Sequence, residues 1–149
     1  MHLTHIALHV ADLGACQAFY ENICGMQTIH TRENNGSKVH WLALPGEEER
    51  FVLVLISGGQ IIKPRANDYS HLGFALSSKD DVDQLADAAR ASGSLIWEPV
   101  SEPFPVGYYC GVRDPNGNNV EFSYGQPLGL GANGDKTGQV EDFKSEATR

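Results

Sequence analysis

An internal repeat constrains the fold of this chain more than any other feature. One segment starts at His5 and reads HIALHVADLGACQAFYENICG, and a second starts at His71 and reads HLGFALSSKDDVDQLADAARASG. Each begins with a histidine and an apolar, strand-like run, passes a helix-capping residue into an amphipathic helix, and ends at a glycine. Self-similarity at this spacing indicates one supersecondary unit present twice.

Capping residues and turn residues set the expected element boundaries. Asp12 and Ser78 are the predicted N-caps, and Gly25 and Gly93 supply the left-handed positions that end the two helices. Asp114-Pro115-Asn116-Gly117 predicts a tight hairpin turn. Three strands are expected after each helix, over 26–31, 37–44 and 50–56 in the first half and over 94–98, 107–113 and 118–124 in the second.

This pattern predicts one α+β domain over residues 1–126, built from two βαβββ modules. The first module is expected at 1–57 and the second at 70–126, with a linker at 58–69. Beyond residue 126 the chain is rich in glycine and polar residues and has few apolar anchors. We therefore expect 127–149 to form a C-terminal tail, partly disordered or wrapped on the surface.

Composition narrows the classes of partner and the compartment. The 149 residues carry a formal net charge of −8, from 19 acidic and 11 basic side chains, so neither nucleic acid nor an anionic membrane is expected to bind. No apolar run is long enough to span a bilayer, and the start of the sequence does not resemble a signal peptide. The odd count of three cysteines, without C-x-x-C spacing, favours reduced thiols and a cytoplasmic location.

Three residues at repeat-consistent positions form a candidate metal-binding set. His5 and His71 open the two copies, and Glu121 lies in the last predicted strand of the second copy. Glu121 follows Gly93 by 28 residues and Val54 follows Gly25 by 29, so Val54 is the first-half counterpart of Glu121. Two imidazoles and one carboxylate can hold a divalent transition metal and leave other positions open, and Fe, Mn, Ni and Zn all fit such a set. The alternative is that these are strand histidines and a glutamate in a protein that binds no metal.

His9, Tyr109 and Glu121 are the candidate catalytic residues. Strand alternation puts His9 on the same face as His5, where a side chain that titrates near neutral pH could act as a base. The alternative is a half-buried histidine bonded to a neighbour. Tyr108 and Tyr109 alternate along one strand, so one of them must face the cavity, and the sequence does not decide between them. We expect Tyr109 to act, with Tyr108 as the alternative.

Several short motifs together resemble the vicinal oxygen chelate superfamily, which includes glyoxalase I, extradiol dioxygenases, fosfomycin-resistance transferases and bleomycin-binding proteins. The matching motifs are HIALHVADL at 5–13, HLGF at 71–74, RDPNGN at 113–118 and VEF at 120–122. The resemblance implies a cup-shaped mixed sheet of two βαβββ modules around a divalent metal, with ligand positions at His5, Val54, His71 and Glu121. It also implies a small-molecule substrate chelated through adjacent oxygens. A homodimer is expected as well, with a shared site formed by the first-strand histidine of one chain and the later histidine and glutamate of the other.

The sequence departs from each named branch of that superfamily. Val54 stands where glyoxalase I has a carboxylate or amide, and Gly111 stands where dioxygenases and fosfomycin transferases place a tyrosine. The positions of the dioxygenase accessory histidines carry Ile56 and Glu102. The expected function is a metal-dependent glyoxalase-like lyase, isomerase or transferase. The alternatives are an Fe(II) extradiol-type ring-cleaving dioxygenase and a metal-free small-molecule binding or resistance protein.

Overall fold

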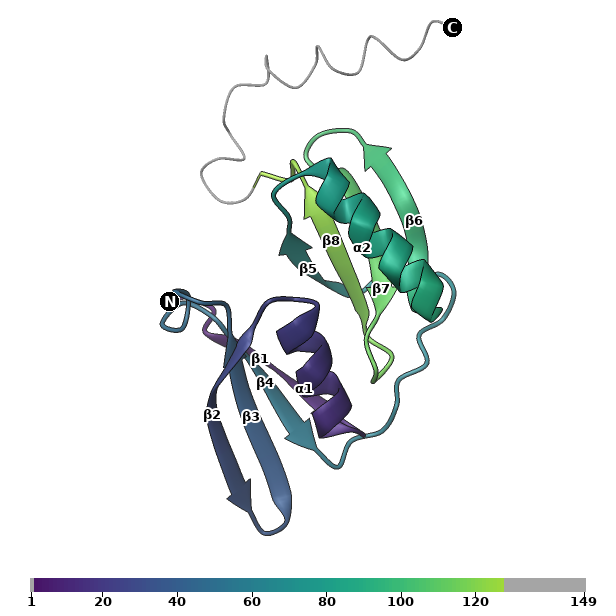
Figure 1. The fold of residues 1–149 in the computed structure, drawn as a ribbon. Helices are drawn as coiled ribbons and strands as arrows, with labels where there is room; N and C mark the ends of the chain where they lie inside the picture. The colour runs from purple at the N-terminus through teal and green to yellow at the C-terminus, as the bar shows by residue number, and fades with distance from the viewer. Residues whose placement is uncertain (1, 128–149) are drawn as a thin grey trace, which may run out of the picture. The chain divides into compact units, whose positions relative to one another are not determined.

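The structure is a computed structural model, and it describes residues 2–127. The strands and helices alternate as two consecutive βαβββ modules, which confirms the predicted α+β class (Figure 1). The first module comprises β1 (His5–Val10), α1 (Leu13–Asn22), β2 (Gln27–Asn34), β3 (Ser37–Ala43) and β4 (Val52–Ser57). The second comprises β5 (His71–Ala75), α2 (Lys79–Ser92), β6 (Leu95–Glu102), β7 (Gly107–Arg113) and β8 (Asn119–Tyr124).

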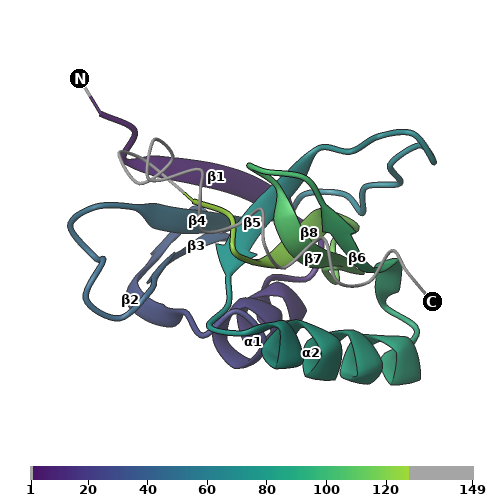
Figure 2. The ribbon, with the colours of Figure 1, turned by 90° about the horizontal axis from the view of Figure 1, so that it is seen from above.

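Each module forms its own four-stranded sheet with the same strand order. The first sheet has the order β1-β4-β3-β2 and the second the order β5-β8-β7-β6. In the first sheet β1 and β4 are parallel, whereas β4, β3 and β2 pair antiparallel. Each helix lies along one face of its own sheet, which leaves the opposite face, here called the inner face, to other side chains (Figure 2).

Side-chain caps start both helices at the predicted residues. Asp12 accepts a hydrogen bond from the backbone N–H of Ala15 at 2.9 Å, and Ser78 accepts one from Asp81 at 3.1 Å. Gly93 ends α2 with φ 75°, a left-handed conformation that glycine adopts without strain. Local sequence therefore fixes where these helices begin and where α2 ends.

The core of the first sheet follows from strand alternation. Leu53 and Leu55 of β4 are almost fully buried and share the helix-facing side with Cys16 and Tyr20 of α1, which are also fully buried. The three- and four-residue spacing of Leu13, Cys16, Phe19, Tyr20 and Ile23 predicts one buried stripe, which is wrong at its end because Ile23 is 47% exposed. The helix stops at Asn22, so the last residue of the stripe leaves the helix before it can pack.

The described chain divides into two compact units. Within the described residues, the first unit contains 2–72 and Arg113–Val120, and the second contains Gly73–Val112 and 121–127. The segment Arg113–Val120 belongs to the first unit because it hydrogen-bonds there: the Ala11 N–H donates to Asn116 Oδ1 at 2.9 Å, and the Ile62 N–H donates to the Asn116 carbonyl at 2.7 Å. The predicted C-terminal tail lies outside the described residues, apart from its first residue.

No helix within residues 2–127 combines the length and apolar character that a membrane crossing requires.

Candidate functional site

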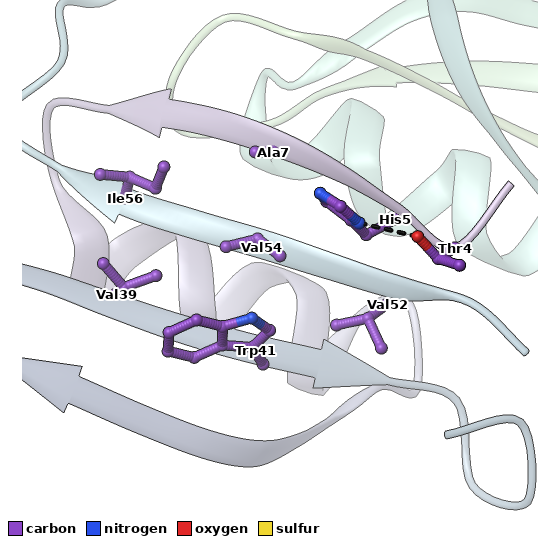
Figure 3. Close-up of a pocket in the computed structure, with 8 residues that line it drawn as sticks. All are labelled: Thr4, His5, Ala7, Val39, Trp41, Val52, Val54 and Ile56. Atoms are coloured by element: carbon purple, nitrogen blue, oxygen red, sulfur yellow. Dashed lines mark hydrogen bonds between the residues drawn. The ribbon is translucent and has the colours of Figure 1, made fainter. Parts of the chain in front are cut away.

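An apolar pocket opens on the inner face of the first sheet, within the first unit. Its cavity volume is about 400 Å³, and Figure 3 shows that its walls come from β1, β3, β4 and the residue before β1. We call it the first-sheet pocket; it is lined by Thr4, His5, Ala7, Val39, Trp41, Val52, Val54 and Ile56. Sequence reasoning placed His5 and Val54 at the site and Ile56 at the position of an accessory histidine. It missed Val39 and Val52, although their alternation along two strands was the available signal.

Strand register explains why Val54 lies at the centre of this pocket. Val54 pairs with Ala7 of β1 on one side and with Trp41 of β3 on the other. The small Ala7 leaves space beside it, and the Trp41 indole forms the opposite wall (Figure 3). His30 of β2 contacts that indole, with ring centroids 5.0 Å apart. The neighbouring His40 bonds Gln17 of α1 at 2.9 Å and so lies on the helix side of the sheet.

The two histidines of β1 make different hydrogen bonds. His5 lies in the pocket, with Nδ1 2.9 Å from the Thr4 hydroxyl (Figure 3). His9 Nε2 lies 3.0 Å from the Ser57 carbonyl oxygen, which can only accept, so His9 carries its proton on Nε2. His9 is not among the pocket-lining residues. Any role of His9 as a base must therefore use Nδ1.

His71 carries its proton on the other nitrogen. Its Nδ1 donates to the Tyr69 carbonyl oxygen at 2.7 Å, which places the lone pair on Nε2. A metal-binding histidine commonly donates its second ring N–H to a backbone carbonyl in this way, because that bond fixes the tautomer and the ring orientation. The geometry of His71 therefore suits a ligand that binds through Nε2.

Glu121 is a buried carboxylate in the second unit. Its side chain is 5% exposed, and along β8 it alternates with Val120 and Phe122, which are fully buried. Buried carboxylates are stable only when they are paired, hydrogen-bonded or bound to a metal. The Leu76 N–H donates to the Ser123 carbonyl at 2.7 Å. This hydrogen bond sets the register of β5 and β8 and places Gly73 beside Glu121. In the same way, Ala7 of β1 lies beside Val54 of β4. The structure thus agrees with the count that made Val54 the counterpart of Glu121.

The two tyrosines of β7 point to opposite faces of the second sheet. Tyr108 donates to Asp83 of α2 at 2.6 Å, so its ring lies on the helix side. That hydrogen bond, together with partial burial, raises the pKa of Tyr108 to about 12. Cys110 shares the helix side, since its thiol lies 3.9 Å from the Val82 carbonyl. Tyr109 therefore faces the inner side, which the sequence alone could not decide.

Trp97 occupies the space that a side chain at position 111 would need. A Cβ atom on Gly111 would lie 2.2 Å from Cε3 of the indole, and the two residues pair across β6 and β7. Gly111 alternates with Tyr108 and Cys110, so the indole lies on the inner face. The position at which related branches carry a tyrosine is thus covered by a tryptophan from the adjacent strand. The sequence offered no direct signal for this substitution.

The turn between β7 and β8 is organised by one carboxylate. Asp114 is 3% exposed and accepts from the Tyr20 hydroxyl at 2.9 Å, from Asn118 Nδ2 at 2.7 Å and from the N–H groups of Asn116 and Asn118. Burial, followed by the charge and hydrogen bond of Asp114, raises the pKa of Tyr20. Gly117 allows the chain to approach Ile62, because a Cβ there would lie 2.0 Å from the Ile62 carbonyl oxygen. The motif that carries the family resemblance therefore has a structural role.

The three cysteines are free, buried thiols, as predicted. Burial raises the pKa of Cys16 to about 12 and that of Cys110 to about 11, so neither is a thiolate at neutral pH. These residues pack in the interior and supply no nucleophile.

The residues predicted to bind a metal are divided between the two units. His5 and His71 belong to the first unit and Glu121 to the second. Within the described chain, no three histidine, cysteine, aspartate or glutamate side chains are grouped as a metal site. The set of His5, His71 and Glu121 stays a prediction, and its chemistry rests on the local geometry of each donor.

Comparison with known proteins places the chain in a family. The model of the Glyoxalase/Bleomycin resistance protein/Dioxygenase superfamily matches residues 2–122. An uncharacterized protein of Pseudomonas aeruginosa, PA2024, is 61% identical over 130 residues, covering 87% of this chain and 93% of that protein. A lactoylglutathione lyase of Haemophilus influenzae is 28% identical over 128 residues, covering 82% of this chain and 91% of the relative.

Solved structures share the fold at low sequence identity. The fosfomycin resistance protein FosX of Listeria monocytogenes superposes with a TM-score of 0.65 at 22% identity, covering 84% of this chain and 93% of FosX. The trypanothione-dependent glyoxalase I of Leishmania major superposes with a TM-score of 0.62 at 20% identity, covering 84% of this chain and 87% of that chain. By its sequence match over 2–122 and its paired βαβββ modules, the chain belongs to the glyoxalase/bleomycin resistance/dioxygenase superfamily, and with it to the vicinal oxygen chelate proteins.

Proposed function

We propose that this protein is a metal-dependent enzyme of the lyase, isomerase or transferase type that acts on a small metabolite bound through two adjacent oxygens. His5, His71 and Glu121 supply the metal ligands. The observation that carries the proposal is the tautomer of His71, whose Nδ1–H is committed to the Tyr69 carbonyl and whose lone pair is on Nε2. A divalent ion of the Fe, Mn, Ni or Zn type fits this donor set.

The other two donors fit the same chemistry. Glu121 offers a buried carboxylate, 5% exposed, and carboxylate oxygens are common ligands of divalent metals. His5 lies at the polar end of the first-sheet pocket, with Nδ1 beside the Thr4 hydroxyl. When bound, the metal supplies Lewis-acid polarisation of the substrate oxygens. Tyr109, on the inner face, and Nδ1 of His9 are the groups proposed to hold or move the proton.

Relatives support this class of reaction. Several curated relatives, from Haemophilus influenzae and Salmonella typhimurium among others, are lactoylglutathione lyases at 26–28% identity. A FosX structure from Listeria monocytogenes contains Mn(II) and 1S,2S-dihydroxypropylphosphonic acid, a ligand with two adjacent hydroxyl groups. These properties belong to those proteins, and they make a chelated oxygenated substrate the best-supported proposal for this chain.

The apolar pocket favours a second candidate, a metal-free binding or resistance protein. A pocket walled by valine, isoleucine and tryptophan side chains can hold a small molecule without a metal. The dioxygenase alternative has less support, because Ile56, at an accessory-histidine position, lines the pocket as an apolar side chain. Metal content separates the metal-dependent lyase, isomerase or transferase from the metal-free binding protein. Oxygen consumption with catechols after ferrous reconstitution tests the dioxygenase alternative.

The deciding experiment is metal analysis of protein purified without chelators. We expect about one divalent ion per chain in the wild type and a loss of most of it in His71→Ala, His5→Ala and Glu121→Gln. His40→Gln is the matched control, because His40 bonds Gln17 on the helix side of the first sheet. Full metal content in His71→Ala would contradict the ligand set, and a metal-free wild type that takes up none of the four metals would favour the binding protein.

The homodimer with a shared site is part of the proposal. Sedimentation of the purified protein should give twice the chain mass. If one chain supplies His5 and its partner His71 and Glu121, a mixture of His5→Ala and Glu121→Gln proteins should regain metal in about a quarter of its sites after subunit exchange. Sites formed within a single chain would show no such recovery.

A further inference from the structure

The geometry points to a substrate that carries an uncharged hydrocarbon group, held against Val54 and Trp41, at the end opposite its metal-binding oxygens. This inference rests on the proposed function and specifies its substrate class. It is drawn from the first-sheet pocket, which lies wholly within the first unit.

Most of the polar groups that the described lining residues contribute lie at one end of the pocket. The polar side chains among its walls are those of Thr4 and His5, which lie together and are bonded to each other at 2.9 Å, and the Trp41 indole N–H adds one further donor. Figure 3 shows His5 and Thr4 near Val52, with Ile56 and Val39 at the other end of the pocket. A ligand that directs its oxygens toward His5 therefore extends along an apolar surface.

The charge of the lining residues limits which chemical group of the ligand can lie along this apolar surface. No lysine, arginine, aspartate or glutamate is among the described residues that line the pocket. An anionic group placed against Val54 and Ile56 would lose water without gaining a counter-ion, which is unfavourable, whereas a ring or a branched chain would bury apolar surface. The pocket thus selects against substrates with a carboxylate at this end and favours those with an aromatic or aliphatic side chain.

Val54 lies between two neighbours of unequal size. Val54 is 6% exposed, with the single methyl group of Ala7 on one side and the Trp41 indole on the other. The contact between Trp41 and His30 holds the indole from the side of β2. A cavity of about 400 Å³ is large enough for a phenyl or isobutyl group together with the oxygens that would bind the metal.

The test compares three α-hydroxy acids that differ only in the side chain: lactate, mandelate and malate. Calorimetric titration of Mn(II)-loaded full-length protein should show mandelate binding about 30-fold more tightly than lactate, because the phenyl ring adds buried apolar area. Malate should bind more weakly than lactate, because its second carboxylate meets no cation. Val54→Thr keeps the shape of the side chain but replaces one methyl group by a hydroxyl, so it should lower the mandelate preference about tenfold. Ile61→Thr, at a 61% exposed residue outside the pocket, should leave the preference unchanged.

A metal-independent arm separates this inference from the proposed function. Benzyl alcohol has no chelating oxygen pair, so it should bind His71→Ala as well as it binds the wild type and should lose binding in Trp41→Ala. Equal affinities for the three acids in metal-loaded protein, or malate binding as tightly as mandelate, would overturn the inference and leave the metal site intact. If the protein holds no metal but benzyl alcohol still binds and Trp41→Ala abolishes that binding, the proposed function fails and the apolar pocket stands.

Discussion

The two βαβββ modules have the same strand order but opposite chemistry in their last hairpins. Among the described residues, all five buried polar or charged side chains fall between positions 114 and 123, in the turn and last strand of the second module. The matching hairpin of the first module buries apolar residues, and its turn carries an exposed ion pair between Arg50 and Glu47. Backbone pairing is what the repeat conserves, while side-chain polarity has been concentrated in one copy.

Val54 and Glu121 occupy equivalent positions of the two modules and show this difference directly. Both residues lie in the last strand of their module, beside the small third residue of the first strand. One faces an apolar pocket, and the other is a buried carboxylate. A repeated fold can therefore supply a hydrophobic wall from one copy and charged donors from the other.

The largest effect, on metal affinity, is expected when Glu121 of the second module is replaced by valine, the residue at the equivalent position of the first module. Glu121→Val should lower metal affinity by more than about 100-fold, because losing a group that only supports a metal ligand already costs about 10- to 100-fold. Competition with a chelating dye measures the affinity. Glu33→Val is the control at an exposed glutamate, and unchanged affinity in Glu121→Val would remove Glu121 from the ligand set.

The hairpin turns should differ strongly in their contribution to stability. Asp114→Ala leaves four hydrogen-bond donors around a buried position without their acceptor, so it should lower the free energy of unfolding by about 3–5 kcal/mol. Glu47→Ala removes an exposed ion pair and should cost less than about 1 kcal/mol. Urea denaturation measures both, and equal losses would show that the buried turn is no more important than the exposed one.

A carboxylate introduced at position 54 of the first module tests the difference between the two modules in the opposite direction. Val54→Glu should destabilise chelator-treated protein by about 2–3 kcal/mol at pH 8, because the new carboxylate loses water in an apolar pocket. Burial raises the pKa of such a group above its unfolded value of about 4.3, so the loss should vanish below that pH and develop as pH rises through the folded pKa. Val54→Gln should show no such pH dependence. A pH-independent Val54→Glu penalty would mean that the new side chain reaches water.

The smallest expected effect is a change in the pKa of Tyr108, which reports the face of the second sheet to which this side chain points. Asp83→Asn should lower the pKa of Tyr108 from about 12 toward the ordinary value of about 10, because the hydrogen bond to Asp83 is the largest cause of the raised pKa. Absorbance at 295 nm during an alkaline titration follows this change. Since the pKa is raised in the folded protein, the stability it brings is complete below about pH 10 and is lost as pH rises through 12. An unchanged titration would mean that Tyr108 does not contact Asp83.

Much of the fold could be predicted from local signals. Asp12 and Ser78 cap the helices where the sequence placed them, because a cap depends only on neighbouring backbone groups. β7 runs over the predicted residues, and β3 departs from its predicted range by one. Less accurate were the ends of β2 and β6, which extend beyond their predicted ranges, since pairing with a neighbouring strand and not local propensity decides where a strand stops.

The candidate site could be predicted only in part. Counting residues identified Val54 as the counterpart of Glu121, and the strand register agrees. The choice between Tyr108 and Tyr109 required the position of Asp83 on α2, and the Trp97 indole over Gly111 required the register of two strands. The protonated nitrogens of His9 and His71 are fixed by backbone carbonyls that no sequence pattern marks.

Local sequence sets which units the chain builds, two strand–helix–three-strand modules, because helix caps, turns and hydrophobic alternation act between residues a few positions apart. The tertiary structure decided which faces those modules present. Trp41, Val54 and Ile56 become one wall, and Asp114 becomes the acceptor for a tyrosine 94 residues earlier, only when strands distant in sequence come into register. The physical reason is that side-chain environment depends on cross-strand neighbours, and these are set by long-range pairing.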